Sequence, residues 1–133
     1  MMGVHMKTHE IRIGRRRLSL LYNYAALAEM TEKIENYDPG ELVTYVKSPK
    51  FFPTLIEILA RQGEEEDGRT LDVDAAWLAR HMSANPMIIM KYQIAVNETL
   101  AEGMSMETED DDDDDGETDV VLDDLKKKET AGG

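Results

Sequence analysis

The sequence predicts a mainly helical domain of about five helices that opens with a small β-hairpin and is followed by a disordered acidic tail. Three observations lead to this prediction. Apolar residues recur at helical spacing over most of residues 23–102. Residues 10–21 instead alternate apolar and polar side chains with a period of two. Residues 107–133 hold thirteen acidic residues and three lysines, which is ten of the chain's thirteen net negative charges.

The length of 133 residues fits one domain with an appendage. We divide the chain into a flexible N-terminus over 1–9, a helical domain over 10–104 and a disordered acidic tail over 105–133. The tail is predicted to be disordered because a dense block of like charges repels itself and buries nothing. A body of roughly 100 residues has a thin core, so we expect a partner or self-association to add to its stability.

Composition excludes several classes of protein. The sequence has no cysteine, and therefore neither a disulfide framework nor thiolate chemistry. Its apolar runs fall short of the roughly 20 residues of a membrane span, and the N-terminus has no apolar stretch of signal-peptide length. We therefore expect a soluble intracellular protein that does not bind a membrane.

The hairpin prediction rests on two alternating runs around a glycine. Ile11 and Ile13 alternate with polar residues before the turn at Gly14, and Leu18 and Leu20 do so after it. An isolated hairpin is marginal in water, so we expect these strands to pack on the helices.

Local capping signals place the first two helices. Asn23 is expected to cap the first, whose apolar face is Leu27, Met30 and Ile34. Asp38 is expected to cap the second, with Pro39 at its first position and Glu41 closing a capping box. This second helix should end near Ser48.

The third helix is expected to open at residues 51–53, to run to Gln62 and to end with Gly63 as its C-cap. Its broad apolar face should be central to the core: Leu55, Ile56, Ile58 and Leu59. Residues 64–69 are read as a charged loop, and Asp72 is expected to cap the fourth helix.

The fifth helix is predicted to start at Asn85 and Pro86, to run to about Glu102 and to end at Gly103. It carries a long apolar stripe: Ile89, Tyr92, Val96 and Leu100.

No catalytic constellation is visible in the sequence, which lacks a Gly-rich phosphate loop, a nucleophile elbow and a His–carboxylate pair with a nucleophile. His5 and His9 stand four residues apart, but they lack a third ligand and are expected to be solvated. The six aspartates over 110–115 lack the spacing of a calcium loop. We predict a noncatalytic protein without a cofactor or a metal site.

The arginines of the hairpin, Arg12 and residues 15–17, leave three hypotheses open. They contact phosphates, they form a charged edge that blocks sheet extension, or they dock the acidic tail. The net charge of −13 disfavours nucleic acid as a partner.

In order and type of elements, residues 10–104 resemble the tail assembly chaperones of long-tailed bacteriophages and the related gene-transfer-agent proteins. The residues that carry the resemblance are Ile-Arg-Ile-Gly at 11–14, Leu-Ser-Leu at 18–20, Leu-Ala-Glu-Met at 27–30, a helix over 51–61, Leu-Asp-Val-Asp at 71–74 and a last long helix that leads into an acidic tail.

The resemblance implies a function in virion assembly. Such a chaperone coats the tape measure protein, a long helical rod with apolar stripes, in the bacterial host cytoplasm. It is often also made as a longer product, by a one-base ribosomal slip, which recruits tail tube subunits. Both products are absent from the mature virion. Lys126, Lys127 and Lys128 are what a slippery A-rich codon run would encode.

A small helical domain with a Met-rich or aromatic groove can hold an apolar helix, and a homo-oligomer is compatible with a repetitive partner. The predicted partner-binding residues are Phe51, Phe52, Met87, Met90, Tyr92, Val121, Leu122 and Leu125. The alternative function is an acidic-tailed regulatory or nucleic-acid-mimic protein that docks on a basic partner.

Overall fold

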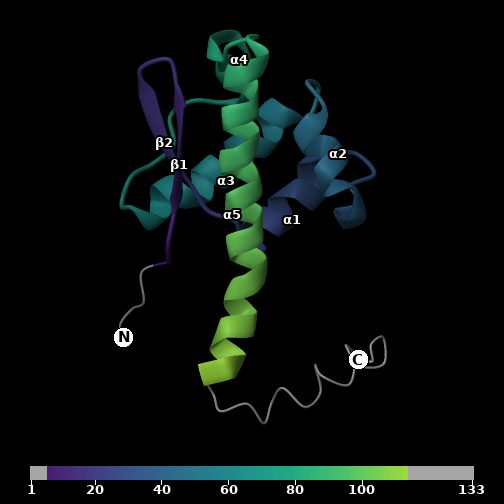
Figure 1. Cartoon of the computed structure of the whole chain (residues 1–133), viewed down its shortest axis with the longest axis vertical. Coiled ribbons are helices and arrows are strands. Elements are labelled where there is room, and N and C mark those ends of the chain that lie inside the picture. The colour runs from purple at the N-terminus through teal and green to yellow at the C-terminus, as the bar shows by residue number, and fades with distance from the viewer. Residues whose placement is uncertain (1–5, 114–133) are drawn as a thin grey trace. The chain divides into compact units, whose positions relative to one another are not determined.

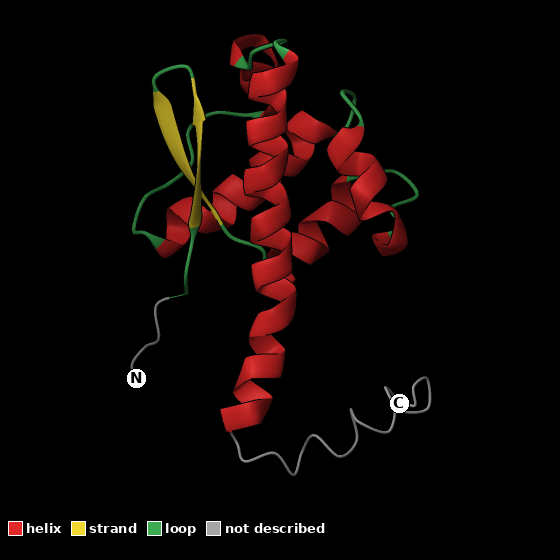
Figure 2. Ribbon diagram, viewed as in Figure 1, coloured by secondary structure: helices red, strands yellow, loops and turns green. Residues whose placement is uncertain are grey.

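The computed structural model describes the backbone of residues 6–113 and the side chains of residues 6–105. It confirms the predicted fold class, because an N-terminal antiparallel hairpin is followed by five α-helices (Figures 1 and 2). The elements are β1 (His9–Ile13), β2 (Arg16–Leu20), α1 (Tyr24–Lys33), the 3-10 turn η1 (Pro39–Glu41), α2 (Leu42–Lys47), α3 (Phe52–Glu66), α4 (Ala75–His81) and α5 (Pro86–Asp113). The chain divides into two units between residues 101 and 102. The site described below lies in the first.

The hairpin has the predicted alternation and turn. Its register pairs His9 with Leu20 and Ile13 with Arg16, which leaves a two-residue turn at Gly14 and Arg15. Gly14 has a φ of 63°, in the left-handed region that glycine enters without a Cβ clash. The inward side chains, Ile11, Ile13, Leu18 and Leu20, are all buried.

Helix α3 is the centre of the core. It contacts β2, α1, α2 and α4, and Figure 1 shows it between the hairpin on one side and α1 and α2 on the other. The predicted apolar face is fully buried: Leu55, Ile56, Ile58 and Leu59. Burying a side chain of this size contributes about 1.5–3 kcal/mol, so this helix supplies much of the driving force for folding.

The predicted end of α3 at Gly63 is wrong. The helix continues through Gly63 to Glu66, and a Cβ at Gly63 would lie 2.1 Å from the carbonyl oxygen of Ser19. Gly63 is therefore needed where the α3 backbone touches β2. The turn after the helix uses Gly68 instead, which has a φ of 84°.

The capping predictions have mixed outcomes. Asn23 caps α1 as predicted, because its side chain accepts a hydrogen bond from the Ala26 N–H at 2.9 Å. Asp38 caps the 3-10 turn, but Glu41 accepts a hydrogen bond from the Thr44 hydroxyl instead of closing a capping box.

The predicted cap of α4 is also wrong. Asp74 takes that role by accepting from the Trp77 N–H at 2.9 Å. Asp72 is instead held by Arg16, whose guanidinium nitrogen lies 2.5 Å from its carboxylate.

Helix α5 begins as predicted and ends later. The Asn85 side chain accepts from the Met87 N–H at 2.8 Å, and the predicted stripe faces inward, with Tyr92, Val96 and Leu100 buried. The helix passes Gly103 and continues to Asp113. One interior glycine costs only about 1 kcal/mol relative to alanine, and the last of the four prolines, Pro86, lies far upstream.

The two predicted flexible ends are described only in part. Residues 105–113 of the predicted tail are helical, and residues 114–133 lie outside the described residues, as does His5. The Met6 N–H donates to the Glu66 carboxylate at 2.8 Å. His9 opens β1 with a side chain only 18% exposed, so the expectation that it is solvated is wrong.

Candidate partner-binding site

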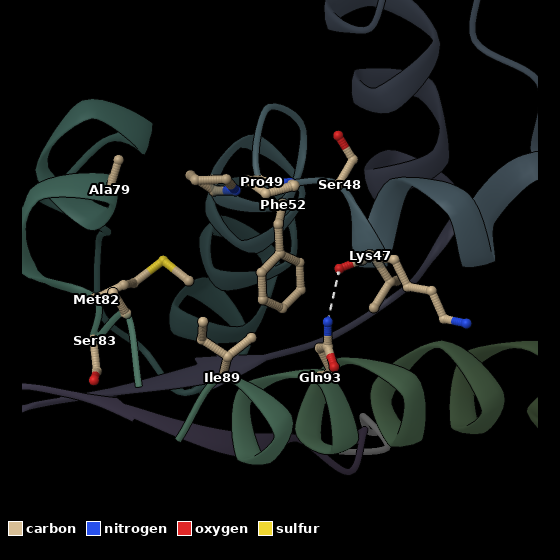
Figure 3. A pocket seen from close by; sticks show the side chains of 12 residues that line it. Lys47, Ser48, Pro49, Phe52, Ala79, Met82, Ser83, Ile89 and Gln93 are labelled. Atoms are coloured by element: carbon tan, nitrogen blue, oxygen red, sulfur yellow. Dashed lines mark hydrogen bonds between the residues drawn. The ribbon is translucent and has the colours of Figure 1, made fainter. Parts of the chain in front are cut away.

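An apolar cavity of about 350 Å³ lies among α2, α3, α4 and the first turns of α5 (Figure 3). Most of its lining is aliphatic or aromatic. The lining residues are Val46, Lys47, Ser48, Pro49, Phe52, Pro53, Ala79, Met82, Ser83, Ala84, Ile89 and Gln93. All of the lining residues lie between Val46 and Gln93, so the cavity belongs to the first unit.

Local sequence signals build the wall between α2 and α3. Helix α2 ends at Lys47, and Ser48 is its C-cap just before Pro49. The Ser48 carbonyl accepts from the N–H groups of Phe51 and Phe52 at 3.1 and 2.8 Å. This turn starts α3 and directs the Phe52 ring into the cavity, toward Ile89 and Gln93 (Figure 3). Phe52 is only 4% exposed and forms the floor.

Two hydrogen bonds hold the opposite walls. The Gln93 side-chain amide donates to the Val46 carbonyl at 3.5 Å and links α5 to α2 (dashed line in Figure 3). The Tyr92 hydroxyl accepts from the Ser83 N–H at 3.0 Å and fixes the segment between α4 and α5. Tyr92 is itself buried, so it supports the wall without lining the cavity.

The structure separates the residues predicted to bind a partner. Phe52 lines the cavity. Phe51 is half-buried beside it and packs edge-on against the Tyr45 ring, with centroids 5.2 Å apart. Met87 and Met90 are exposed on α5 and do not line the cavity. Tyr92 is buried behind the cavity wall, and the remaining three predicted residues lie outside the described residues: Val121, Leu122 and Leu125.

Sequence reasoning missed most of the lining, including Met82, Ala79 and Pro49. The signal that could have indicated the cavity is the pair of proline-marked helix boundaries, at Pro49 and at Pro86. Pro49 itself lines the cavity, and so do Ile89 and Gln93 of the helix that Pro86 starts. Tertiary packing brings these two helix boundaries together, and the spacing of apolar residues along the sequence does not predict that contact.

The arginines of the hairpin have different surroundings. Arg16 pairs with Asp72 and lies 5.6 Å from the centre of the Trp77 ring. Arg12 and Arg17 face each other across the strands and are exposed. The three hypotheses for this patch stay predictions.

A buried carboxylate network, absent from the sequence predictions, joins α3 to β2. Glu64 was assigned to a charged loop, yet it belongs to α3 and is 5% exposed. Its carboxylate accepts from the Ser19 N–H at 2.8 Å and from Arg69 at 2.9 Å. The pKa of Glu64 is lowered from its usual value, mainly by the hydrogen bond from Arg69. Burial acts in the opposite direction and raises this pKa.

A second charged cluster joins α1, α3 and α4. Glu29 and Glu57 are 14% and 13% exposed, and Arg61 pairs with both. Lys33 adds an ion pair to Glu29 at 2.9 Å. Glu57 also accepts from the Ala75 N–H at 2.9 Å, at the start of α4. These charges position the helices around the cavity and do not enter it.

The cavity is suited to binding apolar side chains. Its polar lining consists of Lys47, two serines and Gln93, and one of these, Gln93, is already hydrogen-bonded to the backbone. Across the side chains of residues 6–105, no group of three or more His, Asp or Glu residues is placed to hold a metal ion. Among the helices of residues 6–113, none combines the length and apolar character needed to cross a membrane.

No protein-family model, curated protein or solved structure matches the chain.

Proposed function

We propose that the chain is a noncatalytic tail assembly chaperone of a long-tailed bacteriophage. It binds the tape measure protein in the host cytoplasm, keeps it soluble until the tail tube forms around it, and is absent from the mature virion. A longer product of the same gene helps to recruit tail tube protein. The open apolar cavity is the observation that carries this proposal, together with the resemblance of residues 10–104.

The cavity has the size and chemistry for anchoring a helix. Sites that hold small apolar ligands measure roughly 300–1,000 Å³, and about 350 Å³ accommodates the apolar side chains from one turn of an amphipathic helix. A tape measure protein without its tube exposes long apolar stripes, and such surfaces aggregate unless they are covered. Phe52, Met82 and Ile89 provide the cover in this proposal.

Co-expression with the tape measure protein tests the proposal. Ala79 is exposed at the cavity and Ala28 is exposed on α1, so Ala79→Phe and Ala28→Phe add the same ring inside and outside the site. Losing the burial of one large apolar side chain costs about 1.5–3 kcal/mol, or roughly a ten- to hundredfold rise in Kd.

We expect Ala79→Phe to leave the tape measure protein insoluble and Ala28→Phe to keep it soluble. Equal solubility with both variants would reject the cavity as the binding site. Failure of the unmodified chain to hold the tape measure protein in solution would reject the function itself.

A further inference from the structure

The outward face of α5 carries an apolar stripe beside the cavity. Met87, Met90 and Ile94 are 67%, 50% and 50% exposed. Their inward neighbours on the same turns, Tyr92 and Val96, are buried. Single exposed apolar residues are ordinary, but a contiguous apolar stripe marks an interaction surface.

The spacing of this stripe is that of a coiled coil. Residues 87, 90, 94, 97 and 101 follow one another at intervals of three, four, three and four, which is the a and d pattern of the heptad repeat. All five are exposed: Met87, Met90, Ile94, Asn97 and Ala101. We call them the α5 seam. Met104, also exposed, is next in the same spacing.

We infer that the α5 seam pairs with the seam of a second copy of this chain as an antiparallel two-helix coiled coil. Met87 and Met90 then take part in self-association, whereas the sequence predicted that they bind the tape measure protein. The inference does not depend on the proposed function, because it concerns a different face of α5 and is measured on the protein alone.

Charge and side-chain size favour the antiparallel direction. When Ile94 faces Asn97 of the second copy, Met90 faces the small Ala101 of that copy. Lys91 and Glu98 both follow a seam residue by four positions and flank the seam on one side. In this register Lys91 of each copy approaches Glu98 of the other, which gives two complementary pairs.

The parallel direction lacks these advantages. It aligns each residue with itself, so Lys91 gains no opposite charge from its counterpart. It also brings together the acidic ends of the two α5 helices, residues 107–113, which hold six acidic residues each. In the antiparallel register Asn97 faces Ile94 of the other copy, so this polar residue lowers the stability of the pair.

The seam spans only about two heptads, so the contact is smaller than a standard interface and the pairing should be reversible. We expect the full-length chain to pass from monomer to dimer at micromolar to near-millimolar concentrations in sedimentation velocity. Met90→Lys with Ile94→Lys should abolish dimerisation. Val43→Lys is the matched control, because Val43 is 64% exposed on α2, outside the seam.

Exchanging the charges at positions 91 and 98 tests whether the two α5 helices run antiparallel. Lys91→Glu and Glu98→Lys should each weaken dimerisation several-fold, and the double variant should restore it. The chain has no cysteine, so introduced thiols give a second readout. Chains with Met90→Cys should cross-link to chains with Ala101→Cys, and Met90→Cys should not cross-link to itself, because the two copies of residue 90 are eleven residues apart along the pair in this register.

A monomer at every concentration would overturn the inference, as would a dimer that survives Met90→Lys with Ile94→Lys. Self-linking of Met90→Cys, or a double charge variant weaker than both single variants, would overturn the antiparallel arrangement. Circular dichroism and thermal unfolding of each variant verify that these exposed substitutions leave the fold intact.

Discussion

Gly63 of α3 and Ser19 of β2 meet backbone to backbone, at a distance that leaves no room for a side chain on Gly63. The nearest atoms are the carbonyl oxygen, the carbonyl carbon and the next amide nitrogen, all part of the β2 main chain. None of these can rotate aside. The contact fixes the distance between the hairpin and the central helix, and the Glu64–Ser19 hydrogen bond is formed one residue further along α3.

Substitution of Gly63 by alanine should therefore destabilise the fold strongly. Overpacking a core normally costs 1–3 kcal/mol, and a clash with backbone should reach about 3 kcal/mol or more. Gly40→Ala is the control, because its added Cβ meets only the Asp38 side chain at 3.4 Å. Urea unfolding followed by circular dichroism measures both variants. Similar free energies of unfolding would show that β2 can move away from α3.

The Glu64 carboxylate should give the fold an acid-sensitive component. Its folded-state pKa lies below its usual value of 4.5 because Arg69 and the Ser19 N–H donate to it. The charged carboxylate therefore stabilises the fold at pH above about 4.5, and this contribution is lost as the pH falls through the lower folded-state pKa.

Glu64→Gln should then lower the free energy of unfolding at pH 7 by about 1.5–3 kcal/mol, the range for hydrogen bonds to charged groups. The difference from the unmodified chain should shrink as the pH drops below 4.5. Glu65→Gln changes the adjacent, exposed carboxylate and should have little effect. Denaturant titrations at several pH values measure all three proteins, and a difference independent of pH would contradict the assigned cause.

Removing the Tyr92 hydroxyl should loosen the wall of the cavity. In Tyr92→Phe the Ser83 N–H loses its acceptor, which should cost about 0.5–1.5 kcal/mol. Amide exchange of Ser83, followed by NMR, should accelerate. Tyr24→Phe, at a tyrosine that is 81% exposed, is expected to change neither quantity. Unchanged exchange at Ser83 would mean that another group protects this amide.

Deletion of residues 107–133 separates the two functions that the sequence left open. If the cavity binds the tape measure protein, residues 1–106 should keep that binding, although ten net negative charges are removed. An acidic mimic would instead lose its main activity with this segment. Pull-down of the tape measure protein by the shortened chain, at two salt concentrations, measures the result.

Local signals in the sequence were sufficient for much of the fold. The alternation around Gly14 and the side chains of Asn23 and Asn85 act within a few residues, and the structure contains the hairpin and both helix starts that they predict. The buried faces of α3 and α5 follow equally from apolar spacing.

The errors at Gly63 and Asp72 share one physical origin, which is contact between segments far apart in the chain. Gly63 has the residue type of a helix C-cap, but its lack of a side chain is needed because the β2 backbone lies against it. Asp72 and Asp74 are equally good caps by residue type, and Arg16 removes Asp72 from that role across 56 residues of sequence. The cavity is likewise a product of packing, so only Phe52 among its lining residues had been predicted to bind a partner.

The two faces of α5 have a thermodynamic consequence. Ile89 and Gln93 line the cavity, while Met90 and Ile94, one position further along, belong to the α5 seam. A rotation of this helix about its own axis would move both surfaces at once. Ligand uptake at one face and pairing at the other would then be linked equilibria, in which each event changes the affinity of the other by the same factor.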